Sequence, residues 1–188
     1  MANNALDTSF LDRAIIFAVK AHAGTERRGK GFPYIVHPME AMEIVSTITA
    51  DQELLAAAAL HDTVEDTGVT VEELRAEFGN RVAGIVAAES DSTEEGLDWH
   101  ARKQAALDRL RTASHDVKIV ALGDKLSNMR AIARDHAVKG DRFWSLFHAS
   151  DPAEHAWRYR ALADALRELD GTDAFREFEE LIDKVFGK

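Results

Sequence analysis

The chain has 188 residues, of which 30% are charged and 46% hydrophobic, and its formal net charge is −10. This length fits one domain with a substantial core, and the acidic balance argues against a general binder of nucleic-acid polymers. Cysteine is missing, so disulfides and thiolate metal ligands are excluded, and any metal has nitrogen and oxygen ligands. Because neither a signal-peptide pattern nor a membrane-spanning apolar run is visible, we expect a cytoplasmic protein without membrane attachment.

The first predicted helix covers residues 9–22, where a Ser9-Phe10-Leu11-Asp12 capping box precedes apolar residues at helical spacing. The glycine-rich loop 24–33 follows and carries three basic residues, among them Arg27 and Arg28, against one acid. A solvated run of charge is the commoner interpretation. The alternative is a phosphate clamp, because guanidinium groups bind phosphate oxygens bidentately.

The second predicted helix starts at Pro38, which suits a first turn. His37 lies just before it and, taken alone, is most simply a loop histidine.

The next helix is the centre of the chain. Seven apolar residues at 54–60 lead directly into His61-Asp62-Thr63-Val64-Glu65-Asp66, and alanine and leucine are strong helix formers. On a helix, His61 and Glu65 share one stripe, and Asp62 and Asp66 share the next. Buried polar groups are costly unless they are paired or coordinate an ion, so the stretch indicates either a helix cap or part of a metal site.

The rest of the chain also predicts helices, and no segment alternates apolar and polar residues as strands do. The fold class is therefore predicted to be all-α, although residues 137–150 are ambiguous. The remaining predicted elements are a helix from Thr70 to Gly79, a helix around 82–86, a surface loop at 90–96, a helix capped by Asp98, a long helix from Ser114, a helix from Asp151 to about Asp170 and a last helix at 172–186.

Asp124 lies in the otherwise apolar part of the long helix. It could simply be a buried acid paired with Lys125 or Arg130. Asp124 and Asn128 are four residues apart and share a face, so both could also point into one pocket. The neighbouring Gly123 costs about 1 kcal/mol relative to alanine in a helix, which a close approach of another group would explain.

In combination, these motifs resemble those of HD-domain phosphohydrolases. More narrowly, the chain resembles the hydrolase domain of RelA/SpoT-type alarmone enzymes and the stand-alone small alarmone hydrolases. The motifs follow one order across about residues 10–170 and are Ala21-His22-Ala23-Gly24, Arg27-Arg28, Pro33-Tyr34-Ile35-Val36-His37-Pro38, the block 61–67, Phe78-Gly79, Trp99 with Arg102-Lys103, Asp124-Lys125-Leu126-Ser127-Asn128 and Ala156-Trp157-Arg158-Tyr159.

The resemblance implies a single all-helical HD-type domain over 1–188, with its core motifs at 10–170 and a C-terminal helix at 172–186. It implies a divalent metal, typically manganese, held by His37, His61, Asp62 and Asp124, with Glu65 and Asp66 as the catalytic acids. The family removes the 3′-pyrophosphate from guanosine tetra- or pentaphosphate and yields GDP or GTP. A small nucleotide is therefore the expected partner, and a homo-oligomer is left open.

The resemblance also points to residues near the substrate. The chain departs from the family where Arg158 replaces a tyrosine of a Trp-Tyr-Tyr run and where Gly123 replaces the usual alanine. These departures leave the metal set intact and bear on substrate choice. The expected substrate residues are Arg27 and Arg28 in the basic loop, Lys125 and Asn128 near the nucleotide, Tyr159 in the tyrosine run and, by fold-level analogy, Arg102 and Lys103 on the pyrophosphate.

Two other functions fit the same residues. The first is an HD phosphohydrolase that acts on another nucleotide, such as a 5′-nucleotidase or a NADPH phosphatase. The second is a nucleotide-binding module without catalysis, against which Glu65 and Asp66 argue, because binding alone does not need them. Glu65, one helical turn past His61, is placed to orient or deprotonate a water.

Overall fold

The computed structural model describes residues 6–90, 98–147 and 149–187. Within these ranges the chain is helical and contains no strand, and Glu26 and Pro33 form an isolated antiparallel bridge. The predicted all-helical HD-type bundle is confirmed. Among the described helices, none combines the length and the apolar character needed to cross a membrane. Apart from Ser90, the predicted surface loop at 90–96 lies outside the described residues.

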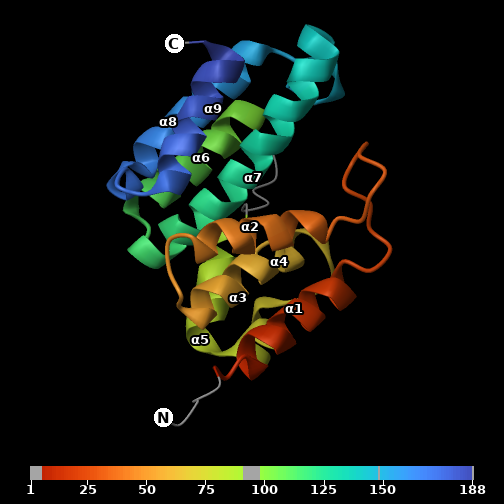
Figure 1. Ribbon diagram of the computed structural model, residues 1–188, viewed down its shortest axis with the longest axis vertical. Helices are drawn as coiled ribbons and strands as arrows, with labels where there is room; N and C mark the ends of the chain where they lie inside the picture. Colours follow the sequence, from red (N-terminus) through yellow and green to blue (C-terminus); the bar gives the residue numbers. More distant parts are fainter. Residues whose placement is uncertain (1–5, 91–97, 148, 188) are drawn as a thin grey trace.

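The helices form two groups joined by one long helix (Figure 1). The first group, α1 to α5, lies at the end with the N-terminus, and α6, α8 and α9 lie at the end with the C-terminus, while α7 packs against members of both. Gly79 (φ 87°) breaks α5 into two segments, as the sequence predicts. The elements are α1 (Ser9–Ala21), α2 (Val36–Ser46), α3 (Gln52–Leu60), α4 (Thr63–Asp66), α5 (Val71–Glu89), α6 (Trp99–Thr112), α7 (His115–Lys139), the 3₁₀ helix η1 (Gly140–Leu146), α8 (Pro152–Ala165), the 3₁₀ helix η2 (Arg167–Leu169) and α9 (Asp173–Phe186).

The predicted helix starts are mostly confirmed by side-chain caps. A cap satisfies a backbone N–H that has no partner within the helix and contributes about 0.5–2 kcal/mol. Thr70 and Glu73 form the complete capping box before α5. The other capping residues that accept a hydrogen bond from a backbone N–H are Asp51, Asp98, Ser114, Asp151 and Thr172.

Two predicted boundaries and one predicted cap are wrong. The N-cap of α1 is Thr8, whose hydroxyl donates to Asp12 at 2.9 Å instead of capping the backbone, so the predicted capping box at Ser9 does not form. His37 lies inside the first turn of α2 rather than before it. The helix that starts at Pro152 ends at Ala165, because the chain tightens into η2 before it reaches Asp170.

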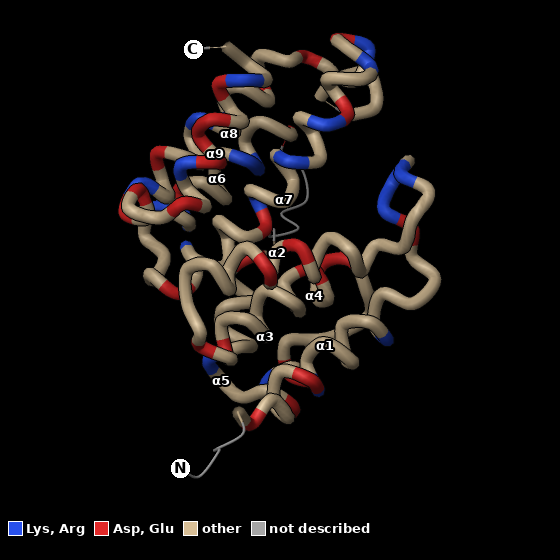
Figure 2. The backbone as a smooth tube through the Cα atoms, viewed as in Figure 1, with Lys and Arg blue, Asp and Glu red and all other residues tan. Residues whose placement is uncertain are grey.

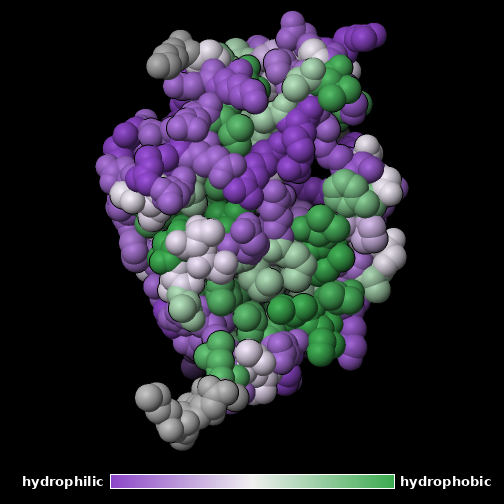
Figure 3. All heavy atoms as spheres, viewed as in Figure 1, coloured by the Kyte–Doolittle hydropathy of each residue, from purple (hydrophilic) through white to green (hydrophobic). Residues whose placement is uncertain are grey.

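The surface differs between the two groups of helices. Ile16 and Val19 on α1 and Val36 at the start of α2 are about half exposed, and hydrophobic side chains gather over this part of the molecule (Figure 3). The face over α6, α8 and α9 is mostly hydrophilic in the same view.

Gly123 explains how closely α2 and α7 approach each other. A Cβ atom at position 123 would lie 2.7 Å from Cγ2 of Val45 and 2.8 Å from the carbonyl oxygen of Ala41. Since the backbone of α2 cannot yield as a flexible side chain can, only glycine fits here. The contact matters for function because α2 carries His37 and α7 carries Asp124.

We predict that Gly123→Ala destabilises the protein although alanine favours helix. Overpacking typically costs about 1–3 kcal/mol and the gain in helix propensity is about 1 kcal/mol. The difference, a net loss of up to about 2 kcal/mol, lowers the Tm by up to roughly 8 °C in a protein of this size. Gly84→Ala is the matched control, because Gly84 lies in α5 and a Cβ atom added there would meet no other atom within 4 Å. Thermal unfolding that shows equal stabilisation by both changes would contradict the packing argument.

Candidate metal centre

The candidate centre is assembled from three places in the chain. His37 comes from the first turn of α2, Asp124 from the middle of α7, and the His61-Asp62 pair from the junction between α3 and α4. The helix is interrupted at this junction, so His61 and Glu65 do not belong to one continuous helix. At the end of α3, side chains hydrogen-bond to the backbone carbonyls that the helix leaves unpaired. The hydroxyl of Thr63 donates to the carbonyl oxygen of Leu60 at 2.7 Å.

The four side chains meet at the polar tips of the two imidazoles. His37 Nε2 lies 3.1 Å from Asp124 Oδ1 and 3.4 Å from Asp62 Oδ2. His61 Nε2 lies 3.0 Å from Asp62 Oδ2 and 3.6 Å from Asp124 Oδ1. His37 and His61 are only 4% and 2% exposed. The central expectation from sequence, that residues 37, 61, 62 and 124 converge, therefore agrees with the geometry.

Hydrogen bonds on the far side of each ring leave Nε2 facing the carboxylates. His61 Nδ1 donates to the carbonyl of Ala58 at 2.8 Å. The hydroxyl of Ser127 donates to Glu40 at 2.8 Å and so accepts from His37 Nδ1, also at 2.8 Å. A partner on Nδ1 is the usual support of a metal-bound histidine. Nε2 is thus the atom of each ring available for a metal.

The carboxylates create a demand for positive charge. Burial lowers the pKa of His61, but Asp62 and Asp124 outweigh burial and hold this pKa well above its ordinary value. Burial likewise raises the pKa of Asp124, yet Lys125 and the two imidazoles bring it well below the usual range. Both carboxylates are therefore ionised, and a cation between them and the imidazoles satisfies the site.

The donor set fits a divalent metal. One ligand atom from each of His37, His61 and Asp62 lies within 4.8 Å of the others, and Asp124 Oδ1 adds a fourth atom beside both imidazoles. His61 Nε2 is buried and has no hydrogen-bond partner among the described residues, as expected for an atom that ligates a metal. Two nitrogen and two oxygen ligands suit a divalent transition metal and leave positions for water.

Asp124 has further partners on its own helix. Lys125 Nζ pairs with Asp124 Oδ2, and Asn128 Nδ2 donates to Asp124 Oδ1. The ion pair with Lys125 that the sequence offers as the simpler interpretation thus exists alongside the contacts with the imidazoles. Arg130 pairs instead with Glu177 on α9, at 2.6 Å.

The basic loop is connected to the centre through Asn128 and Tyr34. Arg27 Nη2 donates to Asn128 Oδ1 at 2.5 Å, and its guanidinium lies 5.2 Å from the centre of the Tyr34 ring. Tyr34 donates its hydroxyl to Asp62 at 2.6 Å, and burial together with Asp62 raises the pKa of this phenol far above its ordinary value. Lysine and arginine positions mark the loop at the edge of the bundle (Figure 2). The loop is thereby connected to Asp124 through Asn128 and to Asp62 through Tyr34.

A polar cavity of about 230 Å³ opens over the centre. It contains most of the site residues predicted from sequence. Tyr34, Glu89 and Arg158 also line it, although no role is predicted for them. The predicted residues that line the cavity are Arg27, His37, His61, Asp62, Glu65, Asp66, Lys103, Asp124, Lys125 and Asn128.

Three predicted substrate residues do not line this cavity. Arg28 and Arg102 are exposed next to Arg27 and Lys103, which do. Tyr159 is 5% exposed and packs against Phe178 and Phe186 of α9. Their roles at the substrate stay predictions, and they lie outside the cavity because neighbours in a helix or a tight loop point in different directions.

Glu89 and Arg158 are the additional residues that carry charge. Glu89 ends the apolar face of α5, three residues after Val86, so an acid on an apolar face was the available signal. Its side chain is 6% exposed, and burial raises its pKa to about 7, with Asp124 adding to the effect and Lys125 opposing it. Arg158 lies four residues before the buried Leu162, which places it on the inner face of α8.

Comparison with known proteins supports a family assignment. A model of the HD domain family matches residues 14–143. The guanosine-3′,5′-bis(diphosphate) 3′-pyrophosphohydrolase MESH1 of Danio rerio is 38% identical over 135 residues, which cover 70% of this chain and 73% of that protein. The GTP pyrophosphokinase rsh of Brucella ovis is 33% identical over 133 residues, 68% of this chain. Because this match covers only 17% of the Brucella protein, the chain corresponds to a small part of that relative.

Solved structures agree on the fold. A metazoan orthologue of SpoT, described as hydrolysing ppGpp, superimposes with a TM-score of 0.78 at 22% identity and covers 97% of this chain and 99% of its own. The protein lmo0812 of Listeria monocytogenes EGD-e gives a TM-score of 0.72 at 27% identity, with 81% and 99% covered. The chain therefore belongs to the HD domain family and is a homologue of guanosine-3′,5′-bis(diphosphate) 3′-pyrophosphohydrolases.

Proposed function

We propose that this protein is a metal-dependent hydrolase that removes the 3′-pyrophosphate from guanosine 3′,5′-bis(diphosphate), giving GDP and pyrophosphate, and GTP from the pentaphosphate. The observation that carries the proposal is the convergence of His37, His61, Asp62 and Asp124 beside two further acids in one polar cavity. The activity is that of the relative in Danio rerio, with which this chain shares 38% identity.

Manganese is the proposed metal, with His37, His61, Asp62 and Asp124 as its ligands. A divalent ion at this place lowers the pKa of a water and offsets the negative charge of phosphate. Tyr34, Ser127 and the carbonyl of Ala58 would fix the orientation of three ligands through the hydrogen bonds described above. The cavity then receives the substrate phosphate above these residues.

Glu65 and Asp66 are the proposed catalytic acids. Both line the cavity from α4 and are exposed, so they can exchange protons with solvent. In our proposal Glu65 takes a proton from the attacking water, whose oxygen forms a bond to the phosphorus attached to O3′ of the ribose. The bond between this phosphorus and O3′ breaks, and the proton passes to O3′, leaving a free 3′-hydroxyl and pyrophosphate. Asp66 orients the water.

Local basic residues explain how an acidic chain binds a polyanion. Arg27, Lys103 and Lys125 line the cavity, although the formal net charge of the whole chain is −10. Asn128 adds an amide beside Arg27. Such a concentrated patch attracts phosphate despite the opposite overall charge. These four residues are the proposed substrate contacts, and the substrate partner is a small nucleotide.

Removing the metal is expected to abolish turnover. Protein treated with a chelator and then freed of it should release no pyrophosphate from guanosine 3′,5′-bis(diphosphate), and manganese should restore the release. Product identification decides between functions, since release of orthophosphate from other nucleotides would favour the 5′-nucleotidase or NADPH phosphatase alternative. Full activity in the metal-free protein, or in His61→Ala, would refute the proposal.

Glu65→Gln tests the proton-transfer role. Loss of a general base typically lowers kcat by about 10²–10⁴-fold, while the KM and the manganese content should stay close to those of wild type. Glu72→Gln is the matched control, because Glu72 is exposed on α5 and contacts Arg75 on the same helix. A Glu65→Gln enzyme that keeps more than half of its kcat would exclude this residue as the base. Tight substrate binding with no turnover in wild type would instead favour the non-catalytic module.

A further inference from the structure

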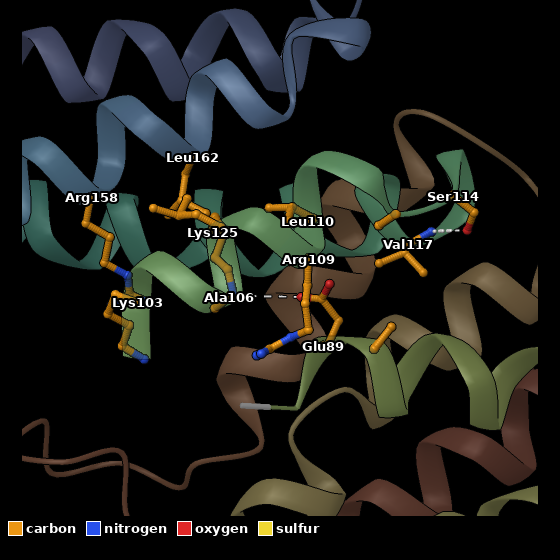
Figure 4. A pocket seen from close by; sticks show the side chains of 13 residues that line it. Glu89, Lys103, Ala106, Arg109, Leu110, Ser114, Val117, Lys125, Arg158 and Leu162 are labelled. Carbon is orange, nitrogen blue, oxygen red and sulfur yellow. Dashed lines mark hydrogen bonds and ion pairs between the residues drawn. The ribbon is translucent and has the colours of Figure 1, made fainter. Parts of the chain in front are cut away.

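A second cavity of about 260 Å³ lies beside the metal centre. Helices α5, α6, α7 and α8 enclose it, and its walls are largely apolar side chains such as Leu107, Leu110 and Leu162 (Figure 4). The two cavities share part of their lining. The residues common to both are Glu89, Lys103, Lys125 and Arg158.

Three of the shared residues are cations that reach one place from three helices. Lys103 comes from α6, Lys125 from α7 and Arg158 from α8. Figure 4 shows Arg158 extending from α8 toward Lys103. Burial and the like charge of Arg158 lower the pKa of Lys125, but Asp124 and Glu89 outweigh them and keep this pKa above its ordinary value. Asp124 and Glu89 are thus already paired with Lys125.

Arg158 has no carboxylate partner in the part of the chain that the structure describes. Its guanidinium there contacts the neighbouring Tyr159 ring, 6.0 Å from the ring centre. Arg130, another partly buried arginine, differs, since it binds both oxygens of Glu177 at 2.6 and 2.7 Å. A half-buried guanidinium beside like charges is unfavourable unless an anion joins it.

The position of Arg158 suggests which anion this is. In the proposed reaction one phosphorus lies beside the catalytic acids in the polar cavity, and a pyrophosphate carries a second phosphate next to it. Arginine binds phosphate oxygens bidentately and is therefore suited to hold such a group. Lys103, which lines both cavities together with Arg158, can share the charge.

We propose that Arg158 binds the distal phosphate of the pyrophosphate that is removed, and thereby selects a diphosphate over a monophosphate at the cleaved position. This inference rests on the proposed function, because it assigns a place to the leaving group of that reaction.

Binding of the inorganic ions tests the inference without turnover. The manganese-loaded full chain is titrated calorimetrically with pyrophosphate and with orthophosphate. Arg158→Ala should raise the Kd for pyrophosphate about 10–100-fold, because a lost hydrogen bond to a charged group is worth about 1.5–3 kcal/mol. The Kd for orthophosphate should stay within about twofold. Arg158→Lys should restore part of the affinity. Circular dichroism and the manganese content show whether each variant is folded and loaded.

Arg160→Ala is the matched control on the same helix. Arg160 is exposed and donates to the carbonyl of Gly187 at 2.8 Å, away from both cavities, so its removal should leave both affinities unchanged. The inference would be overturned if Arg158→Ala weakened the binding of pyrophosphate and orthophosphate equally, or if it weakened the binding of neither ion. A wild type that binds pyrophosphate as expected but releases none from guanosine 3′,5′-bis(diphosphate) would refute the proposed function and leave the role of Arg158 in anion binding supported.

Discussion

Two buried carboxylates facing two buried imidazoles are the constraint on which the rest of this structure depends. Asp124 comes from α7 and Asp62 from the junction of α3 and α4. A carboxylate oxygen of each nevertheless lies within 3.6 Å of Nε2 of His61. Such an arrangement is stable only if positive charge balances it. The close contact of α2 with α7 at Gly123 and the break between α3 and α4 both bring ligands to this point.

The surrounding polar residues divide into those that hold ligands and those that face the cavity. Ser127 and Tyr34 each contact a ligand by a hydrogen bond of 2.8 Å or less. Arg27 contacts Asn128, which in turn contacts Asp124, so the basic loop is tied to the centre itself. Glu65 and Asp66, in contrast, are exposed and remain accessible to a substrate. A rigid ligand set beside accessible acids is the arrangement that metal-assisted hydrolysis requires.

Local features of this fold could be predicted from the sequence, and distant ones only through resemblance. The caps at Asp51 and Thr70 depend on residues two or three positions away, so their signals are complete within the sequence. The direction of a side chain around a helix depends on packing that no short window contains. Arg158 and Tyr159 differ by one position, about 100° around α8, and only the first reaches the cavity. Glu89 was missed although an acid on an apolar face is a signal, because nothing within the helix itself shows what packs against that acid.

The location of a bound metal tests the account most directly. Crystals of the protein grown with manganese should show a single strong anomalous peak within about 2.0–2.3 Å of Nε2 of His37, Nε2 of His61 and a carboxylate oxygen of both Asp62 and Asp124, as ligand distances to divalent metals require. A peak elsewhere, or no peak at saturating manganese, would contradict the claim that these four side chains form one metal site.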